Sequence, residues 1–295
     1  MIEDLTTLSA DEVADLVETL VLTAEPRAMG FHAIECSLKR LAPAMPPRLD
    51  SAIAVMERRK QAIGSHYPFE IQGAAVRRMP SWLKGPYACL LPLSPNGLFR
   101  WGMSAADIVR AAKVFECIVV VALKLLLGGR AEAVRFAWPS ENGRPPEFPD
   151  AILWLAQKMQ LRVGSGYRPP RRRDGGVDVV AWRNFGDNRS AFPIILTQCT
   201  IQRDATIKSC EIDVRQWSQW LMMLRDPTTA FAVPFVFGRA SEEWNELAQR
   251  HVVLDRLRLA HLLGERGDDA IGDLEEVVSF IGQQFDAVTQ SIASA

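Results

Sequence analysis

Two apolar strands joined by a short polar turn constrain the fold of this chain more than any other feature. Residues 177–182 form the first predicted strand, and residues 192–199 form the returning one. Gly186-Asp187-Asn188 supplies the hairpin turn between them. The second strand is a continuous apolar run, which is typical of a strand buried on both faces. We therefore expect a compact α/β unit with mixed strand directions in this region.

Helix and strand patterns on both sides of this pair complete the expected unit. Pro149 opens a predicted helix at residues 150–161, and an arginine-rich loop follows it. After the strand pair, the sequence predicts a helix, a third strand that tolerates Pro234 only at an edge or a bulge, a second helix and a short strand. These four elements are expected at residues 214–224, 229–237, 241–250 and 252–254.

The N-terminal part of the chain is predicted to be mainly helical. Ser9 and Glu12 form a capping box that starts the first helix. The expected helices are residues 10–24, 31–41, 50–64 and 104–127, with a last helix at 273–294 and a strand candidate at 87–93. The turn-rich stretch between Pro139 and Pro146 is the expected boundary. We therefore expect a helical accessory domain at 1–145, a mixed-sheet α/β core at 146–264 and a C-terminal helix region at 265–295.

Composition and charge are those of an ordinary globular protein. The chain has 295 residues, of which 48% are hydrophobic and 23% charged, and its net charge is −1. This balance argues against a wholly basic nucleic-acid coat but allows a local basic groove. Five scattered cysteines without a Cys-x-x-Cys pair indicate reduced thiols in a cytoplasmic protein. No signal peptide is recognisable, and the apolar segment 114–127 is too short to span a membrane, so we expect no membrane contact.

Polar residues at the ends of the two strands point to a site for a cation and a phosphate. Asp178 lies at the start of the first strand and Gln198 near the end of the second, so pairing of the strands brings them together. A carboxylate, an amide oxygen and the backbone carbonyl of Cys199 are suitable ligands for Mg²⁺ or Mn²⁺, and Glu211 is a candidate for a further ligand. Lys208 is the candidate for stabilising the charge on the phosphate.

The placement of Asp178 and Gln198 on neighbouring strands resembles the PD-(D/E)xK nuclease superfamily, also called restriction-endonuclease-like. The resemblance covers about residues 148–237. In that family an Asp on one strand and a Glu or Gln on the next bind magnesium, and a Lys two residues later stabilises the attacking hydroxide and the phosphorus centre. The resemblance implies that Asp178 ligates the metal and that Gln198 ligates it or orients the water.

The chain departs from the family pattern at the third position, where Thr200 stands in place of the lysine. Some members of the superfamily carry this lysine on the following helix, and Lys208 is the natural substitute here. Gln198 is neutral and binds a cation more weakly than a carboxylate would. Each residue also has a structural interpretation: Asp178 as a turn cap, Gln198 as a hydrogen-bonded buried amide, and Lys208 as a solvated surface charge.

An arginine-rich loop precedes the two strands. It contains Arg168, Arg171, Arg172 and Arg173, which adjacent prolines hold extended. Such a loop can bind the phosphates of a nucleic acid, or it can be a solvated or partner-facing loop. Nearby aromatic residues are candidates for base stacking, although tryptophans three apart on a helix more often belong to a core. These aromatic residues are Tyr167, Trp182, Trp217 and Trp220.

The residues and the resemblance together predict a metal-dependent nuclease that hydrolyses phosphodiester bonds of DNA or RNA, with DNA favoured. The resemblance implies bacterial restriction or anti-phage defence, with a protein partner in a defence complex. The main alternative is a catalytically inactive nuclease-fold subunit that binds nucleic acid or assembles with a partner, and Gln198 and Thr200 favour it. A third possibility is a scaffold for protein interactions that does not bind nucleic acid.

Overall fold

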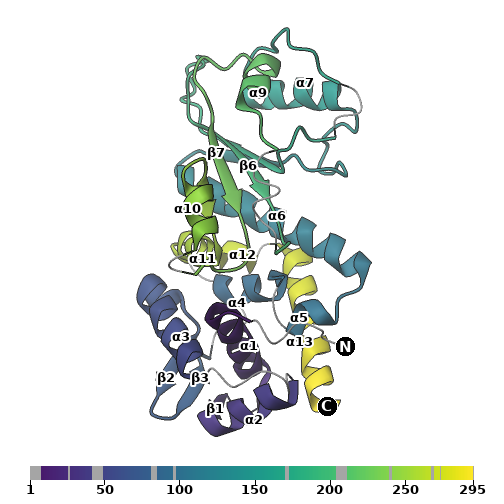
Figure 1. The fold of residues 1–295 in the computed structure, drawn as a ribbon. Coiled ribbons are helices and arrows are strands. Elements are labelled where there is room, and N and C mark those ends of the chain that lie inside the picture. The colour runs from purple at the N-terminus through teal and green to yellow at the C-terminus, as the bar shows by residue number, and fades with distance from the viewer. Residues whose placement is uncertain are drawn as a thin grey trace. The chain divides into compact units, whose positions relative to one another are not determined.

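The chain consists of two compact units (Figure 1). The computed structural model describes residues 8–25, 27–41, 49–80, 85–95, 98–169, 173–203, 211–238, 241–266, 269–272 and 274–294. Unit 1 comprises Met1–Ala111, Pro234–Arg239 and Asp255–Ala295. Unit 2 comprises Ala112–Val233 and Ala240–Leu254. Neither unit is therefore a single continuous stretch of chain.

Unit 1 is built from helices and one small antiparallel sheet. Its helices are α1 (Ala10–Thr23), α2 (Phe31–Leu41), α3 (Leu49–Ile63), α4 (Pro86–Leu90), α5 (Leu98–Trp101), α11 (Arg256–Gly264), α12 (Asp269–Gly272) and α13 (Glu275–Ser294), with the 3₁₀ turns η2 (Gly64–His66) and η4 (Leu91–Leu93). The strands β1 (Ala28–Gly30), β2 (Phe69–Gln72) and β3 (Ala75–Arg78) pair in the order β1-β3-β2. The helices expected in the first 64 residues correspond to α1, α2 and α3, whereas the small sheet was not predicted.

The strand expected at residues 87–93 is helical, so that prediction was wrong. The segment forms α4 and η4 instead. Gly85 is the N-cap of α4, and Pro86 lies in its first turn, where the missing N–H of a proline breaks no helical hydrogen bond. The described side chains of both elements are buried. A continuous apolar run therefore indicates that the segment is buried on all sides, and a short buried helix fits this pattern as well as a buried strand does.

Buried charged residues tie together distant segments of unit 1. Asp15 of α1 accepts hydrogen bonds from Arg59 of α3 and from Arg256 of α11, both at 2.7 Å. Glu18 accepts from Arg59 at 2.9 Å and from the hydroxyl of Tyr87 at 2.9 Å. Burial acts to raise the pKa of Asp15, but Arg256 and Arg59 outweigh it and hold that pKa below its usual value. Because buried charges are stable only when paired, these contacts hold α1, α3, α4 and α11 together.

Unit 2 contains a five-stranded mixed sheet. Its strands are β4 (Glu132–Arg135), β5 (Val179–Trp182), β6 (Ile194–Cys199), β7 (Thr228–Ala232) and β8 (Val252–Leu254), in the order β4-β5-β6-β7-β8. The pairs β4–β5 and β5–β6 are antiparallel, and the pairs β6–β7 and β7–β8 are parallel. The helices α7 (Phe148–Met159), α9 (Val214–Trp220) and α10 (Glu242–Ala248) also belong to unit 2. The prediction of an α/β unit with mixed strand directions is confirmed.

The division between the units falls within the long helix α6 (Ala105–Leu127). Ser104 and Asp107 form a capping box at its start, in which each backbone N–H donates to the other residue's side chain. Gly128, with a φ of +64°, follows its last residue, as the glycine pair in the sequence predicts. Across the described residues, no helix combines the length and the apolar character that crossing a membrane requires.

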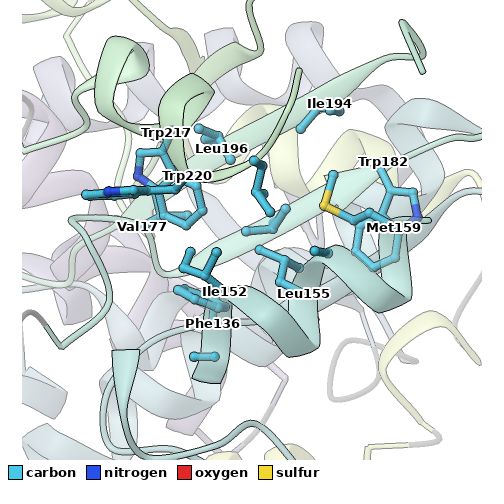
Figure 2. Close-up of a cluster of buried hydrophobic side chains, with 14 of the residues drawn as sticks. Phe136, Ile152, Leu155, Met159, Val177, Trp182, Ile194, Leu196, Trp217 and Trp220 are labelled. Atoms are coloured by element: carbon cyan, nitrogen blue, oxygen red, sulfur yellow. The ribbon is translucent and has the colours of Figure 1, made fainter. Parts of the chain in front are cut away.

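The strand register assigns the side chains of unit 2 to two faces of the sheet. Val134, Val180 and Leu196 are paired across β4, β5 and β6, so they point to one face. Side chains of α7 and α9 cover this face and form a buried apolar cluster with it (Figure 2). On the opposite face, the Nε of Arg135 donates to Glu116 of α6 at 2.6 Å. The sheet therefore lies between α7 and α9 on one side and α6 on the other.

The two units do not follow the domain boundaries expected from the sequence. β4 precedes residue 146 but pairs with β5, so it belongs to the sheet of unit 2. The C-terminal helix α13 belongs to unit 1, where the ring of Phe285 packs on Phe99 with 4.9 Å between ring centroids. The turn-rich stretch between Pro139 and Pro146 is a loop that connects β4 to α7, and both of these elements belong to unit 2.

Candidate functional site

The register of β5 and β6 brings Asp178 and Gln198 to the same end of the sheet. Val179 pairs with Thr197, so Asp178 and Gln198 lie one residue beyond this pair on adjacent strands. Their side chains share the face that carries Val180, because alternate residues of a strand point to the same side. The two positions lie just beyond the apolar cluster that α7 and α9 cover. The structure thus brings together the two polar positions that the sequence singled out.

Hydrogen bonds on both sides fix Asp178 at this end of the sheet. Its Oδ2 accepts from the N–H of Cys199 at 2.7 Å, and its own N–H donates to the carbonyl of Thr197 at 2.9 Å. Its carbonyl accepts from the N–H groups of Phe136 and Ala137. Asp178 therefore has a structural role at the strand end. The two oxygens of a carboxylate offer about four acceptor positions, so a carboxylate can accept a backbone hydrogen bond and bind a cation at the same time.

Glu211 fixes the orientation of the Gln198 side chain. The Nε2 of Gln198 donates to the Oε2 of Glu211 at 2.7 Å. Only the amide nitrogen can donate to a carboxylate, so the amide oxygen of Gln198 must point elsewhere. Gln198 is 2% exposed, and its Oε1 has no hydrogen-bond partner among the described residues. A buried acceptor left unsatisfied costs about 1–3 kcal/mol, so this oxygen is suited to receive a cation or a donor from a ligand.

Gly176 allows the chain at Glu211 to pack against the turn before Asp178. Its φ is +79°, a conformation that L side chains rarely adopt. A Cβ at this position would also collide with the backbone carbonyl of Glu211. Gly176 therefore permits the close approach that places Glu211 beside Gln198. The glycine pair before the first strand was the sequence signal for this contact, but only the structure identifies the residue it faces.

Thr200, at the position of the family's lysine, makes hydrogen bonds to the backbone of a neighbouring residue and of β7. It is buried, its hydroxyl accepts from the N–H of Gln202 at 3.1 Å, and its N–H donates to the carbonyl of Ala232 at 3.0 Å. Lys208 lies in the segment 204–210, outside the described residues. The roles of Lys208 and of the Cys199 carbonyl therefore stay predictions. Asp213, the other acid near Glu211, caps α9 by accepting from the N–H of Gln216 at 3.1 Å.

The donor atoms at this end of the sheet fit Mg²⁺ or Mn²⁺ only as a partly solvated ion. Among the described residues, no three His, Cys, Asp or Glu side chains are grouped as they would be around a metal. The side-chain oxygens at this end of the sheet among the described residues are those of the Asp178 carboxylate, the Gln198 amide and the Glu211 carboxylate, whose Oε2 already accepts from Gln198. Mg²⁺ commonly keeps several waters and takes one or two carboxylates plus substrate phosphates as ligands. The residues fit that mode of binding and not an all-protein cage.

A buried arginine holds the arginine-rich loop near its end. Arg144 donates to the backbone carbonyl of Arg173 and lies over the ring of Phe136, 4.4 Å from its centroid. Burial lowers the pKa of Arg144, and the nearby Asp174 opposes this effect. The Arg173 side chain is exposed, and Arg168 is half-buried. Arg171 and Arg172 lie outside the described residues. Sequence reasoning missed Arg144 because nothing in its local pattern distinguishes it from a surface residue.

The three tryptophans proposed for base stacking belong to the core. Trp182 and Trp217 are 0% exposed and Trp220 is 2% exposed, and all three are part of the apolar cluster (Figure 2). They are closed to a nucleic acid, so the stacking hypothesis was wrong for them. Tyr167, by contrast, is 79% exposed.

Comparisons with known proteins leave the family of this chain unassigned. No family model matches the sequence, and no curated protein matches it. Among solved structures, a similarity was found to the MspJI restriction endonuclease in complex with a 27-mer oligonucleotide, at a TM-score of 0.23 and 15% sequence identity. It covers 65% of this chain and 41% of that protein's chain. A similarity this distant assigns neither the fold nor the function.

Proposed function

We propose that unit 2 is a metal-dependent nuclease core that hydrolyses phosphodiester bonds of DNA or RNA, with DNA favoured. The observation that carries the proposal is the buried Oε1 of Gln198, which has no partner among the described residues and lies on the strand beside Asp178. An unsatisfied oxygen next to a carboxylate is a costly arrangement unless a cation binds there. The mixed sheet covered by helices on both faces is compatible with the restriction-endonuclease-like layout that the sequence resembles.

Each of the candidate residues has a defined task in the proposed reaction. A bound Mg²⁺ or Mn²⁺ supplies the positive charge that polarises the phosphate and activates a water. Asp178 holds the cation, and Gln198 either binds it through Oε1 or orients the water. Lys208 stabilises the negative charge that develops on the phosphate. Glu211 acts through Gln198, whose amide it orients. The arginines of the loop at 168–173 bind the nucleic-acid backbone.

Thr200 favours a second function, in which the chain is a nuclease-fold subunit that does not catalyse cleavage. Its hydroxyl and N–H are engaged in backbone contacts, and it supplies no positive charge where the family has a lysine. Such a subunit would bind nucleic acid or a protein partner. Bacterial restriction or anti-phage defence, with a protein partner in the complex, is the proposed setting for either function.

Cleavage by the wild type and by Asp178→Asn distinguishes the two functions. Asparagine keeps an oxygen that accepts from the Cys199 N–H but loses the charge. Asp187→Asn, in the exposed turn between β5 and β6, is the matched control. With Mg²⁺ or Mn²⁺ present, we expect wild type and Asp187→Asn to cut, and Asp178→Asn to cut about 100-fold more slowly or less. If the wild type binds DNA or RNA but never cuts either, alone or with its partner, the non-catalytic function is correct.

A further inference from the structure

Three hydrogen bonds fix the start of the arginine-rich loop onto the end of α9, and a fourth, from Arg168 to Gly164, lies within this segment. The N–H of Gly164 donates to the carbonyl of Trp220 at 2.9 Å, and the N–H of Gly166 donates to the carbonyl of Gln219 at 3.0 Å. A Cβ at either glycine would collide with the backbone of Gln219. The Nη1 of Arg168 donates to the carbonyl of Gly164 at 3.1 Å, and the Nε1 of Trp220 donates to that of Tyr167 at 2.8 Å. The backbone beneath Tyr167 is therefore rigidly placed.

The same helix also holds the chain that leads into the candidate site. The Nε1 of Trp217, one turn before Trp220, donates to the carbonyl of Gly175 at 3.1 Å. The centroids of the two indole rings are 5.6 Å apart. Asp178 follows Gly175 by three residues, a span of at most about 11 Å. Tryptophans one helical turn apart on α9 therefore hold both the backbone at Tyr167 and the turn that leads to Asp178.

Tyr167 combines this rigid backbone with a side chain open to solvent. It is 79% exposed, whereas the three tryptophans of the same region are buried. A tyrosine on a fixed backbone offers a large flat surface at a small loss of conformational entropy on binding. The half-buried Arg168 follows it in the chain, and the exposed Arg173 lies at the far end of the loop. An exposed aromatic ring followed in the chain by arginines suits a ligand with flat rings joined by phosphates.

We propose that Tyr167 is a stacking subsite for an unpaired nucleobase of the nucleic acid that unit 2 binds. Inside a duplex, both faces of a base are covered by its neighbours, so an aromatic side chain can stack only on a base that is single-stranded, terminal or displaced. The subsite therefore directs the protein toward single-stranded or locally opened nucleic acid. It rests on the proposed binding of nucleic acid by unit 2, and it does not require cleavage.

Binding of a single-stranded oligonucleotide without divalent metal tests this subsite. The probe carries 2-aminopurine bases, whose fluorescence reports stacking, and it is compared with the same sequence as a duplex. Base–aromatic stacking contributes about 1–3 kcal/mol per base, so Tyr167→Ala should weaken single-strand binding about 5- to 100-fold. Tyr167→Trp and Tyr167→Phe should restore it. On an oligonucleotide with abasic positions, wild type and Tyr167→Ala should bind equally.

Phe185→Ala is the matched control. Phe185 is 69% exposed and follows β5, at the end of the sheet opposite Asp178. The Phe185→Ala variant should bind the single-stranded oligonucleotide as tightly as the wild type does. Equal single-strand binding by Tyr167→Ala and wild type overturns the subsite, even if the wild type cleaves nucleic acid. A loss of binding in Tyr167→Ala supports it, even if no variant cleaves. If the wild type binds no oligonucleotide, the subsite is overturned whatever the cleavage assay gives, and the exposed ring then serves a protein contact.

Discussion

At the scale of single residues, Gln198 determines what the candidate site can do. Its nitrogen is held by the exposed Glu211, and its buried oxygen has no partner among the described residues. The residue thus offers a neutral oxygen, where a carboxylate would bind a cation more strongly. With Asp178 as the charged ligand, we expect weak metal binding until a phosphate joins the ion.

Exchanging the side chains of Gln198 and Glu211 tests whether residue 198 is a ligand of the metal. In Gln198→Glu alone, two carboxylates would face each other across a 2.7 Å contact, and we expect a loss of about 3 kcal/mol of stability without metal. In the double variant Gln198→Glu/Glu211→Gln, the amide donates in the opposite direction and the net charge is unchanged. This variant should fold as the wild type does and bind Mn²⁺ at least 10-fold more tightly. Equal Mn²⁺ affinities, measured calorimetrically without nucleic acid, would contradict the ligand role.

At the scale of secondary-structure elements, α4 shows where sequence patterns are ambiguous. Its residues form a short apolar run, and such a run fits a buried strand and a buried helix equally well. Long-range contacts, which local patterns do not contain, accompany the helix: the hydroxyl of Tyr87 donates to Glu18 of α1. The strands around the candidate site were easier to predict from the sequence, since β5 and β6 are apolar and a clear turn separates them.

The buried ionisable groups of α4 predict a loss of stability in alkali. Burial raises the pKa of the Cys89 thiol to about 12 and raises the pKa of the Tyr87 phenol. A group whose pKa is raised by folding stabilises the folded state below its ordinary pKa, and this contribution is lost as the pH rises. Unfolding in urea should therefore become easier above about pH 9, by up to about 1.4 kcal/mol per pH unit for each group.

Cysteine variants isolate the contribution of α4 to this alkaline transition. Cys89→Ala should reduce the fall of the urea midpoint between about pH 9 and pH 10, since the ordinary pKa of a thiol, about 8.5, lies below this range and that of tyrosine, about 10, lies at its upper end. Cys36→Ala changes an exposed thiol and should leave the fall unaltered. A midpoint that stays constant from pH 8 to pH 11 would show that these groups are not enclosed as described.

At the scale of the whole molecule, the sequence predicted the elements better than their grouping. The mixed strand directions, the order of the helices and the pairing of the strands that carry Asp178 and Gln198 follow from local patterns, although the sequence did not predict β4. The grouping of the elements into two units does not follow from local patterns. Unit 1 joins segments such as α1 and α11 through Asp15 and Arg256, which are 241 residues apart in the sequence. The Glu211 contact and the burial of the tryptophans also depend on how distant segments pack. Local patterns specify strands and turns, whereas these contacts arise only in the folded chain.

We propose that Asp178 and Gln198 hold a divalent cation against a phosphate. Electron paramagnetic resonance of Mn²⁺, recorded with a phosphorothioate oligonucleotide that resists hydrolysis, measures this binding directly. The wild type and Asp187→Asn should each bind Mn²⁺ at this site, and Asp178→Asn should bind it at least 10-fold more weakly, because the charged ligand is lost. Equal binding by Asp178→Asn and the wild type, or no binding by the wild type, would contradict the claim.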